Sequence, residues 1–407
     1  MNAIGSRPTL ASERIPLLDA VRGIALGGIL LANLMSFFGA DMIDASSRRA
    51  MAWGDAGEAV LFGINWLVEG KFYSIFSMLL GVGFALQLAR SPRPRVFDAF
   101  FRRRMTVLIA IGLTHMYLLW AGDILTLYGV MGLLLPALFR MPDRPRTAVM
   151  IALFSVPLLT HVMVNWSDGR LNPRTPFAAA ALEVRRHFGI ADRAPLEAFA
   201  HDGPASYWAW NTSTAVTRPG AYLQSGRPAK VLALFLLGAW VGASVLPRLN
   251  RIREALIITV AIGGTIGLMA SFVYASIKAS TGSTFLMSPV GLIQTAAYTL
   301  GTTPLALAYL AAAALAWRTI AGRAALEWFV PLGRMALTVY LTQSLIQLAL
   351  FSGYGFGLAG RVPIALLPPT AIAILVAQRY TCAWWLRNYV QGPMEYVWRR
   401  ATYGATG

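Results

Sequence analysis

Apolar stretches of about 20 residues recur along this chain, and arginines stand in the short polar segments between them. A stretch of that length crosses the hydrocarbon core of a bilayer, about 30 Å thick, as an α-helix. Of all residues, 57% are hydrophobic and 13% are charged, whereas a soluble domain carries roughly 25% charge. The pattern therefore predicts an all-α integral membrane protein, a bundle of about 10 transmembrane helices.

The excess of positive charge follows the ends of the apolar stretches. A net charge of +17 would usually suggest nucleic acid as a partner. Arginines placed between apolar stretches are instead the topology signal of a membrane protein, so we exclude nucleic acid. Residues 90–104 hold six arginines and one acid, Asp98. Because positively charged loops stay inside, this loop is predicted to be cytoplasmic.

That assignment sets the direction of every other span and places both termini in the cytoplasm. The polar segment 167–228, with seven arginines and five acids, is long enough to translocate regardless of its charge. Residues 58–69 are predicted to be an interfacial or re-entrant piece, divided from the next span at Gly70-Lys71. The predicted spans are about 17–38, 72–89, 105–120, 124–139, 147–166, 229–246, 256–277, 289–316, 329–350 and 364–385.

Five parts follow from this topology. They are a cytoplasmic N-terminus (1–16), a first transmembrane half (17–166), an extracytoplasmic segment of mixed helix and loop (167–228), a second transmembrane half (229–385) and a tail (386–407). The tail is predicted to be an amphipathic helix on the cytoplasmic face. Membrane lipid is the expected surrounding partner.

Two ionisable residues stand in the hairpin predicted at 102–128. His115 lies near the end of one apolar run, and Asp123 follows the tight turn at Ala121-Gly122. Charged groups inside a membrane are costly and are therefore functional hypotheses. A carboxylate that holds one ring nitrogen leaves the other free as a general base. Alternatively, His115 only bonds a neighbouring helix and Asp123 only caps the second helix of the hairpin.

A second polar group is predicted near the inner side of the membrane. Asp19 and Arg22 are three residues apart and so share a helix face. They form either a structural ion pair or, through Arg22, a site for a phosphate or carboxylate. Arg334 needs an anionic partner, either Asp19 or a ligand. Arg102, Arg103 and Arg104 are either a topology anchor or part of the same anion site.

The remaining polar candidates are expected near the outer side, with His115 and Asp123. Asn33, Glu69 and Lys71 are candidate substrate contacts. The bland interpretation, which spacing alone favours, is that Glu69 and Lys71 are ordinary interfacial charges and that Asn33 hydrogen-bonds another helix. Tyr73, Trp120 and Tyr128 line a cavity or belong to the aromatic belt.

Several kinds of site are excluded by the sequence. Cys382 stands alone, so neither an internal disulfide nor a cysteine-based metal site is available. His161, His187 and His201 are too scattered for a metal site, and no metal is expected. The chain has no P-loop, dinucleotide fingerprint or G-x-S-x-G turn.

Five segments together resemble the YeiB-like family of bacterial inner-membrane proteins, a domain of unknown function. The segments are 17–34, 70–84, 103–135, 333–346 and 385–402. The family's hairpin motif, G-x-x-H-x-x-x-x-W-x-G-D-I-L-x-x-Y, is matched at Gly112, His115, Trp120, Gly122-Asp123 and Tyr128. One position departs from the usual pattern, because Val339 stands where the family generally has asparagine.

The family is in turn similar to membrane acyltransferases of the heparan glucosaminide acetyltransferase and acyltransferase-3 type. These share a first-span pattern D-x-x-R-G, matched here by Asp19, Arg22 and Gly23. The resemblance implies transfer of an acyl group from a cytoplasmic acyl-CoA or acetyl-CoA to a small-molecule or sugar acceptor outside. The heparan enzymes carry their catalytic histidine after the first span. Residues 34–58 here hold no histidine, so we assign that role to His115.

Three functions remain open at this point. In a membrane acyltransferase, His115 is the base, Asp123 orients it, Lys71 and Asn33 contact the acceptor or oxyanion, and Arg22 and Arg334 hold the donor. In a transporter or exporter of a small anionic or amphiphilic compound, His115 and Asp123 relay protons. A non-catalytic scaffold leaves both polar groups unexplained. The chain could also form a homodimer.

Overall fold

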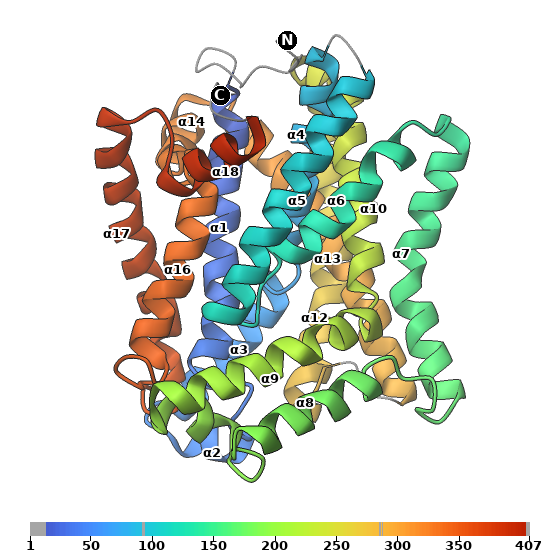
Figure 1. The fold of residues 1–407 in the computed structure, drawn as a ribbon. Coiled ribbons are helices and arrows are strands. Elements are labelled where there is room, and N and C mark those ends of the chain that lie inside the picture. The colour runs from blue at the N-terminus through green and yellow to red at the C-terminus, as the bar shows by residue number, and fades with distance from the viewer. Residues whose placement is uncertain (1–13, 92–93, 285, 287, 404–407) are drawn as a thin grey trace.

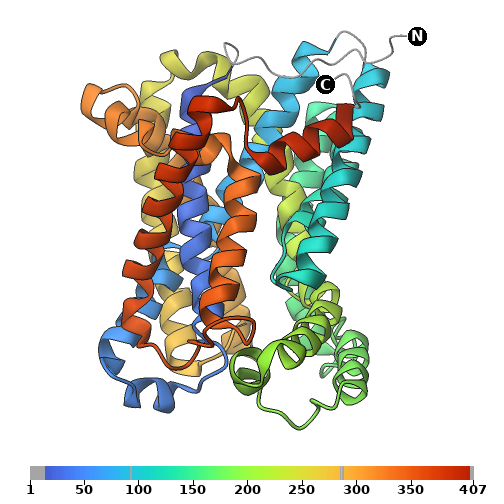
Figure 2. The same ribbon diagram turned by 60° about the vertical axis from the view of Figure 1, so that its left-hand side comes forward.

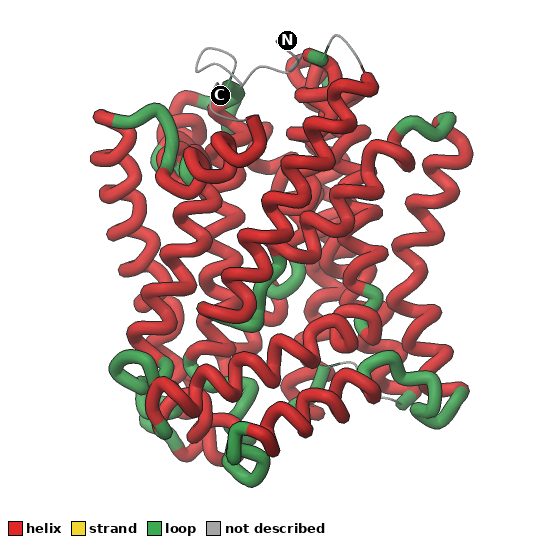
Figure 3. The backbone as a smooth tube through the Cα atoms, in the orientation of Figure 1, coloured by secondary structure: helices red, strands yellow, loops and turns green. Residues whose placement is uncertain are grey.

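The computed structural model describes residues 14–91, 94–284, 286 and 288–403. Helices build this part of the chain and it contains no strand, which confirms the predicted all-α class (Figure 3). Long helices run side by side, and shorter helices lie across both ends of the bundle (Figure 1). Most of the predicted N-terminus at 1–16, together with Arg93 and the last four residues of the predicted tail, lies outside the described residues.

The first half of the bundle begins with α1 (Pro16–Phe37), whose apolar residues carry it through the centre of the molecule. We call the end at which α1 begins the terminal end, and the other the opposite end. At the opposite end the chain turns through α2 (Ala45–Ala50) into α3 (Gly54–Leu67). The helices that follow are α4 (Lys71–Arg90), α5 (Pro94–Leu118), α6 (Leu125–Phe139) and α7 (Asp143–Trp166).

The predicted division of the second apolar stretch is confirmed. α3 ends at Leu67 and α4 begins at Lys71, with Gly70 between them at a backbone φ of +83°. Only glycine adopts this left-handed conformation readily. Whether α3 re-enters the membrane or lies at its surface stays a prediction.

The polar segment between the two halves packs across the opposite end (Figure 2). It contains α8 (Thr175–His187), η2 (Glu197–His201) and α9 (Gly203–Gln224), joined by loops. This agrees with the predicted mixture of helix and loop. Because α9 lies over the α5–α6 hairpin, the segment closes the bundle instead of projecting away from it.

Within the described residues, the second half returns through five long helices and several short ones. α10 (Arg227–Trp240) packs along α4, and α18 (Pro393–Tyr403) lies across the terminal end, where an amphipathic tail helix was predicted. The elements between them are η3 (Val241–Val245), η4 (Leu246–Arg251), α11 (Arg253–Ile258), η5 (Thr259–Gly263), α12 (Gly264–Thr281), α13 (Pro289–Ala316), α14 (Ile320–Glu327), α15 (Val330–Arg334), α16 (Ala336–Phe351), η6 (Ile364–Leu366) and α17 (Leu367–Asn388).

Within the described residues, seven helical stretches are long and apolar enough to cross a membrane, so this is a membrane protein. α6 and α16 are apolar but shorter, and α5 starts with the charged turns that contain Arg102–Arg104. The count of about 10 spans therefore stays a prediction. The seven stretches are Pro16–Phe37, Gly54–Arg90, Asp143–Trp166, Arg227–Arg251, Arg253–Thr281, Pro289–Ala316 and Ile364–Asn388.

Glycines let α4 and α10 approach unusually closely. A Cβ atom added at Gly238 would lie 2.0 Å from the Met78 carbonyl oxygen, and one at Gly81 would lie 2.1 Å from that of Phe235. Small residues at such contacts allow helix backbones to touch, which is how helices associate inside membranes. This contact brings the beginnings of α4 and α10 together.

Candidate functional site

The α5–α6 hairpin places His115 opposite Asp123. The two helices pack closely at Gly112, where a Cβ atom would lie 2.4 Å from the Thr126 backbone nitrogen. At the turn, a Cβ at Gly122 would overlap the Trp120 ring, whose nearest atom would be 2.2 Å away. Close packing therefore accounts for glycine at both motif positions, Gly112 and Gly122. Trp120 itself is buried against Phe37 at 4.9 Å between ring centroids.

His115 bridges a carboxylate and a hydroxyl. Its Nδ1 lies 3.1 Å from Asp123 Oδ1, and its Nε2 lies 2.8 Å from the Oγ of Ser344 on α16. All three side chains are about 1% exposed. An ionised carboxylate only accepts hydrogen bonds, so the proton belongs on Nδ1 and Ser344 donates to Nε2. The arrangement is that of an Asp–His–Ser triad, which is identified by geometry and not by sequence order.

Asp123 has two functions at once. While Oδ1 faces His115, Oδ2 accepts a hydrogen bond of 2.7 Å from the Thr126 backbone N–H in the first turn of α6. Asp123 therefore contacts the imidazole ring and also caps the start of α6, while its catalytic role stays a prediction. The cap also holds the carboxylate in place against the imidazole ring.

Ser344 was missed by the sequence analysis. It lies in the segment 333–346 that carries part of the family resemblance, but no spacing rule connects it with a histidine 229 residues earlier. Serine in an apolar helix is usually satisfied by its own backbone, and here the Tyr340 carbonyl lies 3.5 Å from Oγ. The shorter contact with His115 is what distinguishes this serine.

α9 covers the triad from the opposite end. The buried side chain of Asn211 accepts from the Ala121 N–H at 2.7 Å and donates to the carbonyls of Met116 and Tyr117. Tyr222 donates its hydroxyl to the Asp123 carbonyl. These contacts tie α9 to the hairpin turn between Met116 and Asp123.

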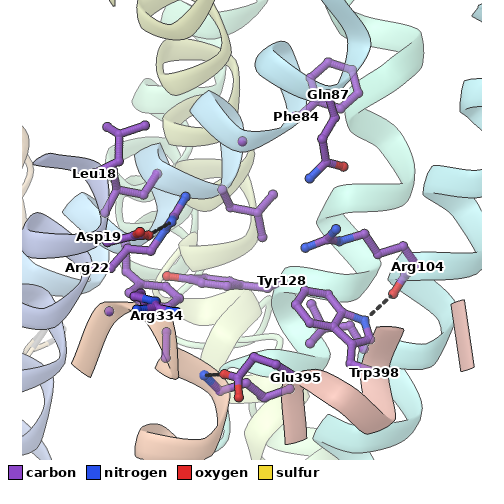
Figure 4. Close-up of a pocket in the computed structure, with 18 of the residues that line it drawn as sticks. Leu18, Asp19, Arg22, Phe84, Gln87, Arg104, Tyr128, Arg334, Glu395 and Trp398 are labelled. Atoms are coloured by element: carbon purple, nitrogen blue, oxygen red, sulfur yellow. Dashed lines mark hydrogen bonds and ion pairs between the residues drawn. The ribbon is translucent and has the colours of Figure 1, made fainter. Parts of the chain in front are cut away.

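A cavity of about 330 Å³ opens on the other side of the triad, toward the terminal end. Its inner end is mostly apolar and is lined by residues of α1, α4, α5, α6 and α16, including Ile29, Leu80, Ile124 and Tyr128. Its mouth is polar and lies between α1, α15 and α18. Figure 4 shows Arg22 and Arg104 reaching in from opposite walls.

The charge at the mouth is predominantly positive. Arg22 Nη1 pairs with Asp19 Oδ1 at 2.7 Å, which confirms the predicted ion pair. Arg104 stacks on the Trp398 ring of α18, 4.2 Å from its centroid. Arg334 also lines the cavity, whereas Arg102 and Arg103 do not, and Arg103 instead donates to the Ala401 carbonyl. The structure adds Arg14, Arg90 and Arg399 to the mouth.

Glu395 attaches α18 to the rest of the mouth. Its Oε1 accepts from the backbone N–H groups of Leu337 and Thr338, at 2.6 and 3.2 Å, and its Oε2 accepts from the Thr338 hydroxyl at 2.6 Å. The carboxyl thus caps the first turn of α16. Burial raises the pKa of Glu395, and the hydrogen bonds from Thr338 and Leu337 offset part of that shift.

Three polar atoms on the cavity wall are buried and have no hydrogen-bond partner within the described residues. They are Gln87 Oε1, Arg334 Nε and the Tyr340 hydroxyl. A buried polar atom left unpaired costs free energy, roughly 1–3 kcal/mol. All three residues also line the cavity.

A single side chain, that of Tyr340, separates the cavity from the triad. Tyr340 lines its inner end, and the Tyr340 ring lies 5.2 Å from the His115 ring, centroid to centroid. Because His115 is itself enclosed, a reactant entering from the mouth reaches His115 and Ser344 only after Tyr340 moves.

The other predicted substrate contacts form a separate cluster. Lys71 donates to the Asn65 carbonyl at 3.1 Å, and Glu69 and Tyr73 lie beside it at the start of α4. Tyr128 connects this region to the cavity, because its hydroxyl donates to the Tyr73 carbonyl at 2.9 Å. Asn33 is half-buried in α1. In the described residues, no group of three or more His, Cys, Asp or Glu side chains could hold a metal ion.

Comparison with known proteins identifies relatives over the whole length. A family model described as "Protein of unknown function (DUF418)" matches residues 242–405. The chain is 30% identical to the uncharacterized protein YxaH of Bacillus subtilis (strain 168), over 98% of this chain and 96% of that protein. It is 28% identical to the uncharacterized protein YeiB of Escherichia coli (strain K12), over 97% and 98%. The chain therefore belongs to the YeiB-like DUF418 family.

Proposed function

We propose that this protein is a membrane acyltransferase, which moves an acyl group from a cytoplasmic acyl-CoA or acetyl-CoA to a hydroxyl or amine acceptor at the outer side. One observation carries the proposal. A triad of Asp123, His115 and Ser344 lies directly behind the inner end of a cavity whose mouth is lined by arginines. A positive mouth and an apolar interior suit a donor with phosphates at one end and an acyl group at the other.

The cavity has the properties that such a donor requires. A volume of about 330 Å³ is at the lower end of the roughly 300–1,000 Å³ typical of small-molecule pockets. Guanidinium groups such as that of Arg22 bind phosphate in bidentate fashion. Gln87 and Arg334, which line the cavity, carry polar groups that suit the donor's amide-bearing arm.

Orientation follows from charge. Arg90 at the end of α4, Arg102–Arg104 in α5 and the basic residues of α18 lie toward the terminal end, which the positive-inside rule assigns to the cytoplasm. In a bacterial cell this is the cytoplasmic side of the inner membrane, with both termini inside. The mouth of the cavity then opens where acyl-CoA is present, and α9 faces outward.

The triad supports transfer in two steps. Ser344 Oγ attacks the thioester carbonyl while its proton moves to His115 Nε2, and Asp123 stabilises the imidazolium that results. The C–S bond breaks, and the departing thiolate takes the proton from His115. The acceptor then attacks the acyl-serine, gives its proton to His115, and Ser344 leaves with that proton. Tyr340, whose ring centroid lies 5.2 Å from that of His115, is placed to donate its hydroxyl to the oxyanion.

A covalent step also removes a topological difficulty. In a single-step transfer, the donor's thioester and the acceptor would have to meet at one point, deep in the membrane, from opposite sides. With an acyl-serine, the donor leaves through the mouth before the acceptor enters beneath α9. Tyr340 then moves aside for the donor and α9 moves aside for the acceptor at different stages, so the two sides of the membrane are never connected.

A second candidate, an anion transporter with a His115–Asp123 proton relay, is favoured by one observation. α4 begins inside an apolar stretch, immediately after Gly70, at the fully buried Lys71. Helices broken in this way form the binding sites of many secondary transporters. A transporter would leave an acyl donor intact, whereas an acyltransferase would cleave it.

The decisive experiment uses the full chain in lipid nanodiscs with acetyl-CoA labelled in the acyl group. We expect CoA release, and a label on Ser344 that intact-mass spectrometry detects before acceptor is added. His115→Ala and Ser344→Ala should each lower the rate by roughly 10³-fold or more.

Matched controls are available in α7. His161 is equally buried and bonds Thr295 Oγ1 at 3.1 Å, without a carboxylate, and Ser155 donates only to the Ile151 carbonyl. His161→Ala and Ser155→Ala should keep full activity. If acetyl-CoA neither binds nor turns over, while proteoliposomes accumulate an anion in a His115-dependent way, the protein is a transporter.

A further inference from the structure

The three lysines of the chain gather in one place, between the start of α4 and the helices beside it. Lys71 and Lys230 are 0% and 2% exposed. Lys278, in α12, donates to Asn65 Oδ1 at 3.0 Å, while Lys71 donates to the backbone carbonyl of the same Asn65. Lys230 donates to Thr302 Oγ1. Buried lysine is rare, because removing an ammonium group from water is costly.

Arg227 adds a fourth cation to this group. It is the first residue of α10, and its guanidinium stacks on the rings of Tyr73 and Tyr222, 5.4 and 5.6 Å from their centroids. A guanidinium has five N–H donors. In the described part of the chain, no oxygen atom accepts a hydrogen bond from Arg227, so its donors remain available to a ligand.

Negative charge does not balance these four cations. Among the ion pairs of the described residues, none includes Lys71, Arg227, Lys230 or Lys278. Glu69 is the acidic residue that interacts electrostatically with Lys71, Arg227 and Lys230, beyond ion-pair distance. Uncompensated positive charge in a membrane protein marks a functional site by default.

The backbone adds further positive potential. α4 and α10 both begin in this cluster, after Gly70 and Gly226, and neither helix has a side-chain cap. The beginning of a helix carries a partial positive charge and free N–H groups, which attract anions. The close packing of α4 against α10 holds these two helix starts next to each other.

We propose that Arg227, Lys230 and Lys71 form a binding site for an oxyanion, a phosphate or carboxylate group. Arg227 supplies a bidentate fork and the two lysines supply point charges. Arg227 and Glu69 are only partly buried, so the cluster reaches the protein surface at these two residues. Four positively charged side chains disfavour a cationic ligand here.

The site adjoins the triad through one residue. Tyr222 lies under the Arg227 guanidinium and donates its hydroxyl to the Asp123 carbonyl. The next step rests on the proposed function. In an acyltransferase, the oxyanion bound at this site is part of the acyl acceptor. The acceptor's anionic group is then held at Arg227 while its nucleophile faces His115.

The test measures anion binding without any acyl donor. The full chain in detergent is titrated with inorganic phosphate and, separately, with acetate, at constant ionic strength in chloride, and thermal unfolding is followed. We expect one of these anions to raise the unfolding temperature in a saturable way. Arg227→Gln and Lys230→Met should weaken the apparent affinity at least tenfold, and Arg227→Lys should weaken it less. Arg253→Gln, an exposed change on α11, is the control.

The mouth of the cavity also carries arginines, so Arg22→Gln provides the discriminating comparison. A shift that persists in Arg22→Gln and is lost in Arg227→Gln supports the site. A shift lost in Arg22→Gln but unchanged in Arg227→Gln overturns it, as does no shift with either anion. The two proposals can fail separately. If the wild type transfers no acyl group but binds the anion, and His115→Ala binds it too, the proposed function is rejected and the anion site stands. If acyl transfer depends on His115 but no anion binds, the anion site is rejected and the proposed function stands.

Discussion

Ser344 Oγ lies 2.8 Å from His115 Nε2, although 229 residues separate the two in the chain. A comparison within the same protein shows why this contact matters. His161 is also buried and bonds the hydroxyl of Thr295 and, at 3.5 Å, the Ser288 carbonyl. Only His115 combines a hydroxyl on one ring nitrogen with a carboxylate on the other among the described residues. That combination polarises the serine.

Asp123→Asn should abolish most acyl transfer while leaving the fold intact. The asparagine oxygen can still cap α6, but its amide cannot hold the proton on Nδ1 as a carboxylate does, so Nε2 loses its basicity. The expected loss in kcat is roughly 10⁴-fold. Rates of labelled CoA release measure it, with Asp143→Asn on exposed α7 as the control. Unchanged turnover would mean that Asp123 is only a helix cap.

Gly83→Leu should block the cavity without harming stability. Gly83 lines the cavity, and a Cβ added there meets nothing within 4 Å. The larger side chain therefore fills space that the donor needs. We expect acetyl-CoA binding, measured by equilibrium dialysis, to weaken at least tenfold. Gly63→Leu is the matched control, since a Cβ at Gly63 also meets nothing within 4 Å. Equal binding by both variants would place the donor elsewhere.

Asn211→Ala should destabilise the cover over the triad. The substitution removes three buried hydrogen bonds, to the Ala121 N–H and to the carbonyls of Met116 and Tyr117. Leaving these backbone groups unpaired costs about 2–3 kcal/mol. The free energy of unfolding is measured in a series of denaturing detergent mixtures. Asn388→Ala, at the exposed end of α17, is the control variant. A change below about 0.5 kcal/mol would show that α9 does not hold the turn.

Glu395 should make the docking of α18 depend on pH. Burial raises the pKa of this carboxyl above its ordinary value of 4.5, so the folded protein keeps the proton at pH values where the unfolded chain has lost it. The stability that Glu395 contributes is therefore fully present below 4.5 and is lost as pH rises through the raised pKa.

Glu395→Gln isolates this effect, because glutamine resembles the protonated acid and can still accept from Leu337 and Thr338. The thermal unfolding temperature of the wild type, relative to the variant, should fall as pH rises from 4.5. A difference that is constant across this range would contradict the assignment.

Several features could be predicted from the sequence because they depend on neighbouring residues. Asp19 and Arg22 pair because a helix places positions i and i+3 on one face. The break at Gly70-Lys71 follows from the length of one apolar stretch and from the glycine within it. The contact between His115 and Asp123 was one of the two interpretations of the hairpin, because a short connection makes two successive helices pack antiparallel; residues 119–124 join α5 to α6.

The tertiary structure alone decided which distant residues meet. Sequence analysis placed Lys71 and Glu69 with His115, but the packing of α4 on α10 groups them with Arg227 and Lys230 instead. It could not find Ser344 or Asn211, because their partners lie 229 and 90 or more residues away. The sequence by itself determined the helices, through apolar length and arginine position. Side-chain fit between helices, which no periodicity records, determined the triad, its cavity and the cationic cluster.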